Sequence, residues 1–444
     1  MVANSILIGY VIVVILEAGG IQLFPLIKCC AGAEHLCVND MAHFMVEEAF
    51  YVHRKAQRHV KLAIEPILGA TRRCQRSLFH GSVDATHQNN GQLFIGRLFC
   101  CQLEEIIGEI KEVKFFNFDT AVKEGRIVYR KNPFNDFLDD IIGLLDMNAL
   151  RERGLRVLFD TMHGSGTYPL QVIFHTARCT IDTMNINKDA YFGGNMPAPT
   201  EDTLSMLRYQ VVKDNYDLGI AMDGDGDRLG VIDRSGRYIN ANEILCMLYY
   251  YLVKYKGWKG GVVRNLATTH MLDKIAESFG EKCYEVPVGF KYISSKIDEV
   301  DAVLGGESSG GLTVRGHIHG KDSVYAASLF AEMVSVIGKN PSEIMDELEA
   351  EFGHFEMVED NLHFAPEYKA TIEKIVFEDK KLPSFNSEVE RVSYDDGCKV
   401  YFKDGSFVIC RFSGTEPLLR IFAEAENKEK AKKYITDFKE FLNI

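Results

Sequence analysis

Through the middle of the chain, short apolar runs alternate with longer amphipathic segments. The runs that predict strands are residues 155–160, 216–222, 229–233, 260–268 and 302–306. Residues 242–255 and 269–280 predict helices, the first with Asn242 at its N-cap and the second closed by Gly280. Because strands and helices alternate, we expect α/β units with largely buried sheets.

The last stretch of the chain has a different pattern. Residues 398–412 predict a hairpin with Asp404 and Gly405 at its turn, and residues 417–425 predict a further strand. Residues 427–442 predict an amphipathic helix, because their apolar side chains recur on one face. A small α+β domain is therefore expected from about Pro366 to the C-terminus.

The length of 444 residues exceeds what one hydrophobic core serves, so several domains are expected. The predicted domains are residues 1–150, 151–256, 257–365 and 366–444. Hydrophobic residues make up 46% and charged residues 25%, as is typical of soluble globular proteins. The net charge of −13 argues against a nucleic acid or an anionic membrane as the main partner. An anionic ligand would then need a local cluster of basic groups.

The apolar run at residues 5–16 is too short to span a bilayer, and no basic residue precedes it. A buried strand or helix is favoured there over a targeting segment, so a cytoplasmic protein is expected. The 11 cysteines are odd in number and lack framework spacing, which favours free thiols over disulfides.

The composition changes near Leu103. Residues 1–101 hold six of the 11 cysteines and six of the 13 histidines, with nine Lys and Arg against seven Asp and Glu. Residues 102–444 hold 41 Lys and Arg against 56 Asp and Glu. Three interpretations are open for residues 1–101: a replaced or degenerate domain, a frame-shifted or otherwise misassembled segment, and a metal site at "CCAGAEHLC". The metal site is disfavoured, because adjacent cysteines with one histidine lack zinc-finger spacing. The second interpretation is favoured, because many cysteines and histidines with few acids and scarce proline are unlike the rest of the chain.

The first loop with chemical character is "MDGDGDRLG", in which Asp223, Asp225 and Asp227 alternate with glycine after a predicted strand. Three close carboxylates repel one another, and their hard oxygens suit Mg²⁺ or Ca²⁺. An EF-hand is excluded, because its glycine and glutamate positions hold Arg228 and Arg234. A solvated acidic turn is the alternative, and it explains one aspartate more easily than three. We expect a metal site here.

Two further loops have the composition of ligand-binding loops. "GGESSGG" at residues 305–311 offers Glu307 and two serines among glycines, which suits sugar hydroxyls, although glycine-rich turns are common without a ligand. In "CRFSGTEPLLR", Arg411 and Arg420 frame a serine, glycine and threonine that suit a phosphate. The alternative for this third loop is a tight turn with exposed arginines. Together, a metal site, a hydroxyl site and a phosphate site predict phosphoryl chemistry on a sugar phosphate.

These motifs, "DGDGDR", "GESSGG" and "RFSGTEPLLR" in this order, resemble the phosphoglucomutase/phosphomannomutase family of the α-D-phosphohexomutase superfamily. The resemblance extends from about Leu103 to Ile444 and includes "NPFNDFLDDI", "DTMHGSG", "VVRNLATTH" and "VGFKYI". It implies four domains: three similar α/β domains around a cleft, and a fourth like the TATA-box-binding-protein fold. It also implies a Mg²⁺-dependent isomerase that interconverts hexose 1- and 6-phosphates through a bisphosphorylated sugar, with hexose 1,6-bisphosphate as activator.

The resemblance also implies roles for individual residues. Asp223, Asp225 and Asp227 match the Mg²⁺ ligands, and Arg228 would lie near the phosphoryl group in transfer. The other matching positions are Glu307 and Ser309 for sugar hydroxyls, Lys291 and Lys321 as basic groups facing the cleft, and Arg411, Ser413, Gly414, Thr415 and Arg420 for the phosphate that does not react. Glucose is the expected sugar and mannose the next, in a monomer or homodimer.

The resemblance does not extend to residues 1–101. The family carries a phosphorylated serine in a "TASHNP" loop, and the most similar string here is "DATHQNNGQLF". In it, Thr86 replaces the serine, the proline is missing and the spacing is compressed. Two functions are therefore expected as alternatives: a mutase, or a sugar-phosphate-binding protein without phosphotransfer. Because no other loop supplies the phosphorylated residue, the chain as written is expected to have little or no mutase activity.

Overall fold

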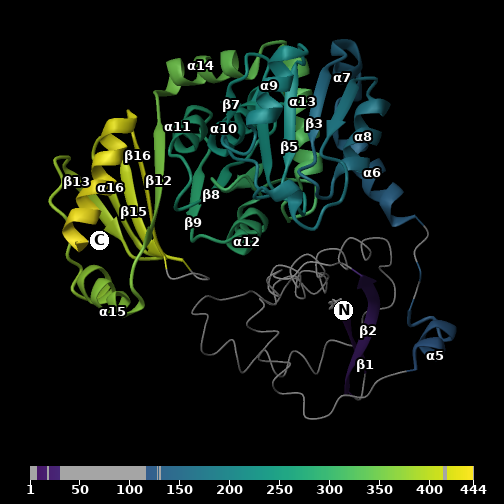
Figure 1. Ribbon diagram of the computed structural model, residues 1–444, viewed down its shortest axis with the longest axis horizontal. Coiled ribbons are helices and arrows are strands. Elements are labelled where there is room, and N and C mark those ends of the chain that lie inside the picture. Colours follow the sequence, from purple (N-terminus) through teal and green to yellow (C-terminus); the bar gives the residue numbers. More distant parts are fainter. Residues whose placement is uncertain are drawn as a thin grey trace. The chain divides into compact units, whose positions relative to one another are not determined.

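The computed structural model describes residues 8–17, 20–30, 117–127, 129, 132–413 and 418–443 (Figure 1). The chain divides into two compact units, Met1–Pro133 and Phe134–Ile444. In the first unit, β1 (Ile8–Glu17) and β2 (Gly20–Cys30) form an antiparallel pair, and α5 (Phe118–Lys123) is a short helix. The apolar run at residues 5–16 thus contributes to a strand.

The first sheet of the second unit has the strand order β4-β3-β5-β6-β7. Its strands are β3 (Arg156–Asp160), β4 (Thr180–Met184), β5 (Leu218–Met222), β6 (Leu229–Asp233) and β7 (Tyr238–Ile239). β3 is parallel to β4 and β5, whereas β6 and β7 are antiparallel additions. Every residue of β5 and β6 is buried, as expected for continuous apolar runs in a sheet covered on both faces.

Helices precede and connect these strands. They are α6 (Pro133–Leu144), α7 (Met147–Arg153), α8 (Thr167–Thr176), the short 3₁₀ helix η1 (Phe192–Gly194) and α9 (Ser205–Lys213). The apolar side chains of α8 cluster with Phe159 of β3 and those of α9 with Leu158, so the two helices cover opposite faces of the sheet, because successive strand residues point to opposite faces. The alternation of strands and helices predicted from the sequence is therefore confirmed here.

The second sheet has the order β11-β10-β8-β9. Its strands are β8 (Val262–Asn265), β9 (Cys283–Val286), β10 (Leu304–Gly306) and β11 (Leu312–Val314). Its helices are α10 (Ala241–Lys254), α11 (Met271–Ser278), α12 (Phe290–Val300), α13 (Ser323–Ile337) and α14 (Pro341–Phe352). β8 is parallel to both neighbours, and β11 runs antiparallel to β10.

The predicted N-cap of α10 at Asn242 is wrong. Asn240 caps this helix, because its side chain accepts from the Glu243 amide while the Glu243 carboxylate accepts from the Asn240 amide. Asn242 lies inside the first turn, where its Oδ1 accepts from the Thr269 amide at 3.3 Å. Gly280 follows α11 with φ +72°, which is the conformation of a residue that ends a helix.

The first two sheets share one hydrophobic core. It joins Phe159 of β3 and Leu218 of β5 to Val262 of β8, with α10 and α13 between them. α13 contacts α7, α8 and α10, so it holds both sheets together. The loops at the ends of these strands therefore extend from elements that share one core.

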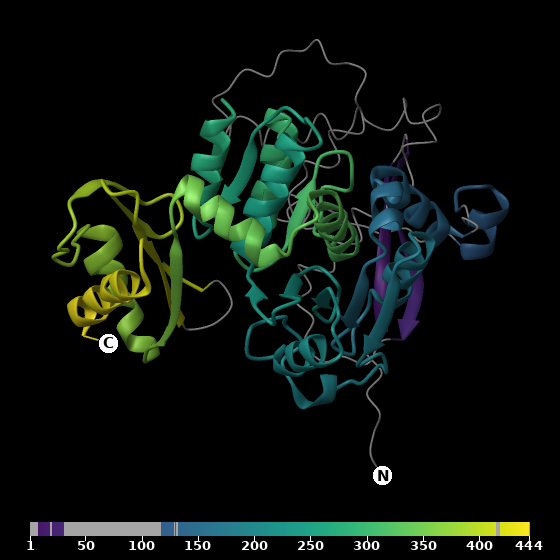
Figure 2. The same cartoon turned by 90° about the horizontal axis from the view of Figure 1, so that it is seen from above.

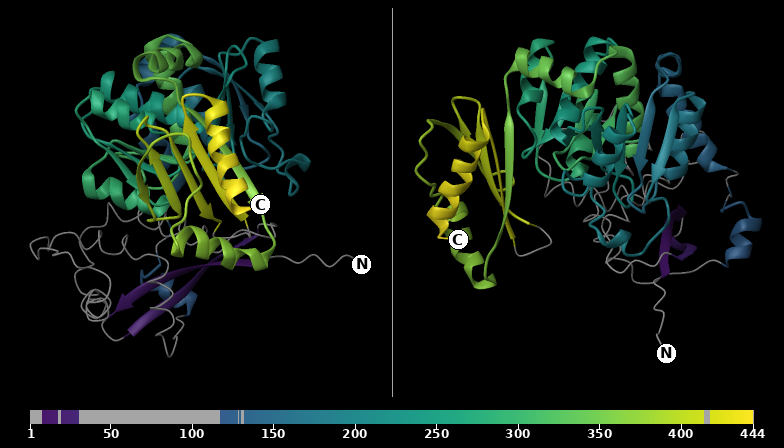
Figure 3. Two further views of the ribbon diagram at one scale, coloured as in Figure 1. Left: turned by 90° about the vertical axis from the view of Figure 1, so that its left-hand side faces the viewer. Right: turned by 45° about the horizontal axis from the view of Figure 1, so that its top comes forward.

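The third sheet is antiparallel throughout and has the order β12-β16-β15-β14-β13. Its strands are β12 (Glu356–His363), β13 (Val389–Ser393), β14 (Cys398–Phe402), β15 (Phe407–Phe412) and β16 (Leu418–Ala425). The predicted hairpin is confirmed as β14 and β15, with Gly405 at φ +89° in the turn. The amphipathic helix α16 (Lys428–Leu442) lies across one face (Figures 2 and 3).

This sheet has its own core beneath α16, completed by α15 (Lys369–Ile372) and the π-helical η3 (Glu373–Glu378), which follow the short 3₁₀ helix η2 (Pro366–Tyr368). Its opposite face presents Phe407, Ile409 and Phe422, which pack against Leu266 and Ala267 after β8. That contact docks the third sheet on the second.

Among the residues described, no helix is both long and apolar enough to cross a bilayer.

Candidate functional site

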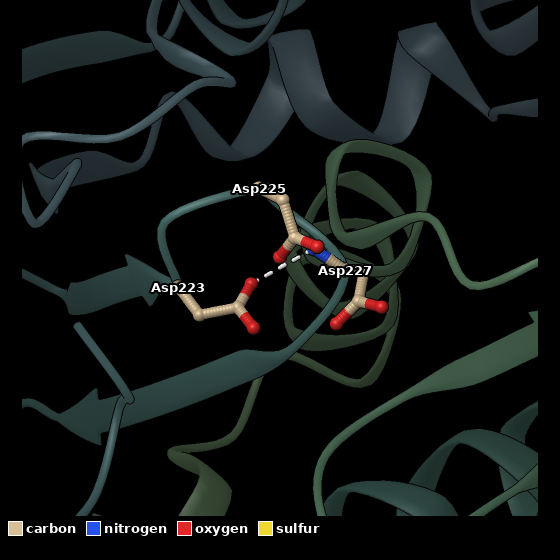
Figure 4. A group of neighbouring side chains, drawn as sticks. All are labelled: Asp223, Asp225 and Asp227. Atoms are coloured by element: carbon tan, nitrogen blue, oxygen red, sulfur yellow. Dashed lines mark hydrogen bonds between the residues drawn. The ribbon is translucent and has the colours of Figure 1, made fainter. Parts of the chain in front are cut away.

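The three aspartates of the "DGDGDR" loop lie between β5 and β6 (Figure 4). One carboxylate oxygen from each lies within 4.8 Å of the others. Asp223 Oδ1 accepts from the backbone N–H groups of Asp227 at 2.8 Å and Arg228 at 2.9 Å, which folds the loop over its own first carboxylate. Gly226 has φ +79°, a conformation that glycine adopts without strain.

The electrostatics of this loop favour a bound cation. Burial, together with the charges of Asp227 and Asp225, raises the pKa of Asp223 to about 7. Burial and Asp227 also raise the pKa of Asp225. The basic neighbours are Lys321, which pairs with Asp227, and Arg228, whose Nε lies 3.6 Å from Asp223 Oδ2. Three hard anionic oxygens at this spacing fit a divalent cation such as Mg²⁺ or Ca²⁺.

The second loop lies directly against the aspartate loop. Glu307 follows β10 and is 8% exposed. Its Oε1 accepts from the Asn265 side-chain amide at 3.1 Å and the Gly289 backbone N–H at 3.2 Å, while the Ser309 hydroxyl lies 3.5 Å from Oε2. The Leu229 amide donates to the Gly310 carbonyl at 3.2 Å, which ties this loop to the strand that follows the aspartates.

The third group is a pair of arginines that face each other across two strands. Arg411 of β15 and Arg420 of β16 are directly opposite in the antiparallel register. The Nε atoms of both are buried and have no hydrogen-bond partner within the described part of the chain. Like charges directly opposite each other destabilise a sheet, so an anion between the two guanidiniums would relieve the repulsion and satisfy both donors.

A cleft of about 490 Å³ in the second unit is lined by residues of the second and third groups and reaches Arg228 of the aspartate loop, although none of the three aspartates lines it. Its lining includes Arg228 beside the aspartates, Glu307, Ser309 and both arginines. Such a volume suits a small polar ligand rather than a macromolecule. The structure thus brings five of the predicted site residues around one space.

Of the remaining predicted residues, the structure describes Ser413 and Lys291. Ser413 follows β15, and its N–H donates to the Leu418 carbonyl at 2.9 Å. Lys291 is exposed on the first turn of α12, where its ammonium lies 5.0 Å from the ring centroid of Tyr292 and forms no ion pair with a described residue. Gly414, Thr415 and Thr86 lie outside the described residues.

Two residues that contact the site were not singled out from the sequence. Asn265 ends β8, and its side chain donates to Glu307 while accepting from the Ala267 amide at 2.9 Å. Asp396 lies before β14 and contacts Arg411. A polar residue at the carboxyl end of a buried strand was a usable signal for Asn265. No sequence signal pointed to Asp396, because its partner Arg411 lies on another strand.

Comparisons with known proteins agree with this arrangement. Three domain models of one family match: "Phosphoglucomutase/phosphomannomutase, alpha/beta/alpha domain II" at residues 135–236, domain III of the same type at 240–352, and the C-terminal domain at 363–441. A phosphoglucomutase/phosphomannomutase of Thermococcus kodakarensis is 29% identical over 306 residues, or 69% of this chain. That match spans 64% of the relative, which is less than two thirds of its length.

Two further relatives are similar. A probable phosphoglucosamine mutase of Methanosarcina acetivorans is 30% identical over 327 residues, covering 74% of this chain and 70% of the relative. The crystal structure of a putative phosphomannomutase from Thermus thermophilus superposes with a TM-score of 0.60 at 25% identity, over 70% of this chain and 65% of that one. With its motifs on the loops around one cleft and its three sheets matching successive domains, the chain belongs to the phosphoglucomutase/phosphomannomutase family.

Proposed function

We propose that the cleft binds a hexose phosphate and that the protein functions as a Mg²⁺-dependent phosphohexomutase, which interconverts hexose 1-phosphate and hexose 6-phosphate. The observation that carries this proposal is the facing pair Arg411 and Arg420. In each of them Nε is buried and has no hydrogen-bond partner among the described residues. Both arginines line the cleft together with Glu307 and with Arg228 of the aspartate loop. A ligand that satisfies all three groups has a phosphate at one end and hydroxyls in the middle.

The arginines would bind the phosphate that does not react. Two guanidiniums offer several N–H donors to phosphate oxygens, and their positive charge offsets the dianion. Glu307 would accept hydrogen bonds from sugar hydroxyls, since its carboxylate is held in place by Asn265 and Gly289. The Ser309 hydroxyl can donate to or accept from a second hydroxyl of the sugar. These contacts orient the sugar so that its other end faces the aspartates.

Asp223, Asp225 and Asp227 would hold Mg²⁺, since three hard anionic oxygens within 4.8 Å of one another match its ligand preference. A bound Mg²⁺ would offset the negative charge of a phosphoryl group in transfer. Arg228 would donate to the same phosphoryl oxygens. Its Nε forms no hydrogen bond in the described chain, and its ion pairs with Asp223 and Asp227 are long, at 3.6 and 3.7 Å.

Transfer also needs an oxygen that is phosphorylated beforehand, and the resemblance assigns that role to a serine of domain 1. In this chain Thr86 is the first candidate. After the first transfer, the bisphosphorylated sugar would turn over in the cleft so that its other phosphate reaches the acceptor, and hexose 1,6-bisphosphate would serve as activator. A sugar-phosphate-binding protein without phosphotransfer is the second candidate, favoured by the lack of a "TASHNP" loop in residues 1–101.

Glucose phosphates are the first proposed substrates and mannose phosphates the next. The names of the relatives include phosphoglucosamine mutase, so glucosamine phosphates belong in the same test. Glu307 and Ser309 would bind hydroxyls that these sugars largely share, and they therefore support the class of substrate rather than one sugar.

Two measurements test the proposal. Calorimetry of the full chain with glucose, mannose and glucosamine 6-phosphates should show binding by about millimolar ligand, and Arg420→Ala should weaken it. A coupled assay with the 1-phosphates, Mg²⁺ and a trace of the 1,6-bisphosphate then separates the two candidates. Turnover on the order of 1–10³ s⁻¹ identifies a mutase, whereas binding without turnover identifies a binding protein. Absence of both would refute the proposal.

A further inference from the structure

Asp396 contacts two parts of the cleft at once. It lies in the turn at residues 395–397 that precedes β14. Its Oδ1 lies 3.4 Å from Nη2 of Arg411, and its Oδ2 accepts from the backbone N–H of Val288 at 2.8 Å. Val288 belongs to the segment between β9 and α12, and both it and Arg411 line the cleft. One carboxylate therefore links the third sheet to the second beside the proposed ligand.

The turn that carries Asp396 fits closely against β15. Gly397 has φ +95°, and a Cβ atom at this position would lie 2.7 Å from both the Arg411 Cβ and the Cys410 carbonyl oxygen. Both the backbone conformation and the space therefore require glycine. This close approach fixes the backbone of Asp396 relative to Arg411.

The link continues on the other side of Val288. The next residue, Gly289, donates its N–H to Glu307 Oε1 at 3.2 Å. Arg411 is thus connected to Glu307 through Asp396 and two consecutive backbone amides. The two ends of this path are the residues proposed to hold the phosphate and the sugar hydroxyls.

We infer that Asp396 is a positioning residue that holds Arg411 in the cleft and sets its placement relative to Glu307. Arg411 needs such a partner because Arg420 lies directly opposite and repels it. The Asp396 carboxylate offsets this repulsion while leaving Nε of Arg411 without a partner in the described chain. The inference rests on the proposed function for the identity of the ligand, but the contacts themselves do not depend on it.

The first test compares Asp396→Asn with Asp395→Asn. The asparagine keeps an acceptor for the Val288 amide and removes the charge from Arg411. The control alters the adjacent aspartate, which is bonded to Ser393 in the exposed part of the turn. Calorimetry with glucose 6-phosphate should show about tenfold weaker binding for Asp396→Asn, as expected for a displaced charge-assisted contact, and no change for the control. Unchanged affinity for Asp396→Asn would overturn the inference.

A double-mutant cycle separates positioning from a general structural role. If Asp396 acts through Arg411, Asp396→Asn should not weaken binding further in a chain that already carries Arg411→Ala. An equal loss in both backgrounds would mean that Asp396 acts by another route and would overturn the inference.

A measurement without ligand keeps this result separate from the proposed function. Hydrogen exchange of the full chain should be faster at residues 286–291 and 305–311 in Asp396→Ala than in the wild type or in Asp395→Ala, because the Val288 amide loses its acceptor. If the wild type binds no hexose phosphate, the proposed function fails, and the exchange data then decide this inference alone. Faster exchange in both segments supports the path from Asp396 to Glu307, and unchanged exchange overturns it.

Discussion

A buried ionic network fixes the third sheet on the second, and we predict that its central carboxylate cannot be replaced without a large loss of stability. Glu285 of β9 accepts from Arg264 Nη1 at 2.6 Å and Lys399 Nζ at 2.7 Å, and from the Tyr401 hydroxyl. The side chains of Arg264 and Lys399 are only 3% and 1% exposed. Glu285→Gln would leave two buried cations without their shared counter-charge.

The expected magnitude follows from the contacts that remain. Arg264 would keep Asp273, with two contacts at 2.8 and 3.1 Å, and Lys399 would keep the Leu266 carbonyl at 2.7 Å. Removing one partner of a buried ion pair costs about 3–5 kcal/mol, so these remaining contacts place Glu285→Gln near the lower end, at about 3 kcal/mol.

Removing Lys399 should cost less. In Lys399→Met, Glu285 still pairs with Arg264 and Tyr401, and the methionine fills the space of the lysine stem. Losing the hydrogen bonds to the Leu266 carbonyl and the His270 ring should cost about 1–2 kcal/mol. The carboxylate variant is therefore expected to be the more destabilised of the two.

The cost of Glu285→Gln should also depend on pH. Burial and the nearby Arg264 lower the pKa of Lys399 to about 7, so the unfolded chain binds more protons than the folded chain between about pH 7 and the ordinary lysine value of about 10.4. The contribution of Lys399 to stability therefore rises with pH across that window and is constant below it. Without Glu285, the pKa of Lys399 falls further, and the loss of stability should be larger at about pH 6 than at about pH 8.5.

Urea denaturation at both pH values, followed by circular dichroism and Trp258 fluorescence, measures these differences. Glu388→Gln is the matched control, because its ion pair with Lys403 is exposed and should contribute about 0–1 kcal/mol. The reasoning is refuted if Lys399→Met costs as much as Glu285→Gln, or if the cost of Glu285→Gln is the same at both pH values.

Three further predictions concern the cleft and the phosphorylated residue. Asp225→Asn should weaken Mg²⁺ binding by at least about tenfold in calorimetry, because it removes one of three anionic ligands; unchanged affinity would place the metal elsewhere. Arg420→Ala should weaken glucose 6-phosphate binding about ten- to hundredfold, and in an active form it should raise KM more than it lowers kcat, since the grip is similar in ground and transition states. Wild-type affinity would contradict that role. Replacing residues 1–101 with a family-like domain that carries "TASHNP" should produce mutase activity in the coupled assay. Equal turnover by the unmodified chain would contradict this, because the chain would then already supply a phosphorylated residue. Phosphopeptide mapping would test Thr86 first.

Local features of the sequence were sufficient for much of the fold and part of the site. The aspartates converge because residues 223–228 form one tight loop between two strands. The function of so short a loop can be predicted from its own residues. The hairpin at Gly405 and the helix α16 follow from turn chemistry and from the spacing of apolar residues, which also act over a few positions. The predicted domain boundaries stay predictions. The misplaced cap at Asn242 was a local error, since the Asn240 and Glu243 pair was visible in the sequence.

Contacts between distant segments were decided by the tertiary structure alone. Arg411 and Arg420 both stood out in the sequence, but only the register of β15 and β16 places them directly opposite each other. Glu285 and Lys399 are 114 residues apart, and nothing near either one predicts its partner. Asp396 meets Val288 only because the apolar face of the third sheet docks on the second. Hydrophobic patterns specify which face of an element is buried, whereas its partner depends on how whole sheets pack, and that packing sets the distances between the charged groups of the cleft.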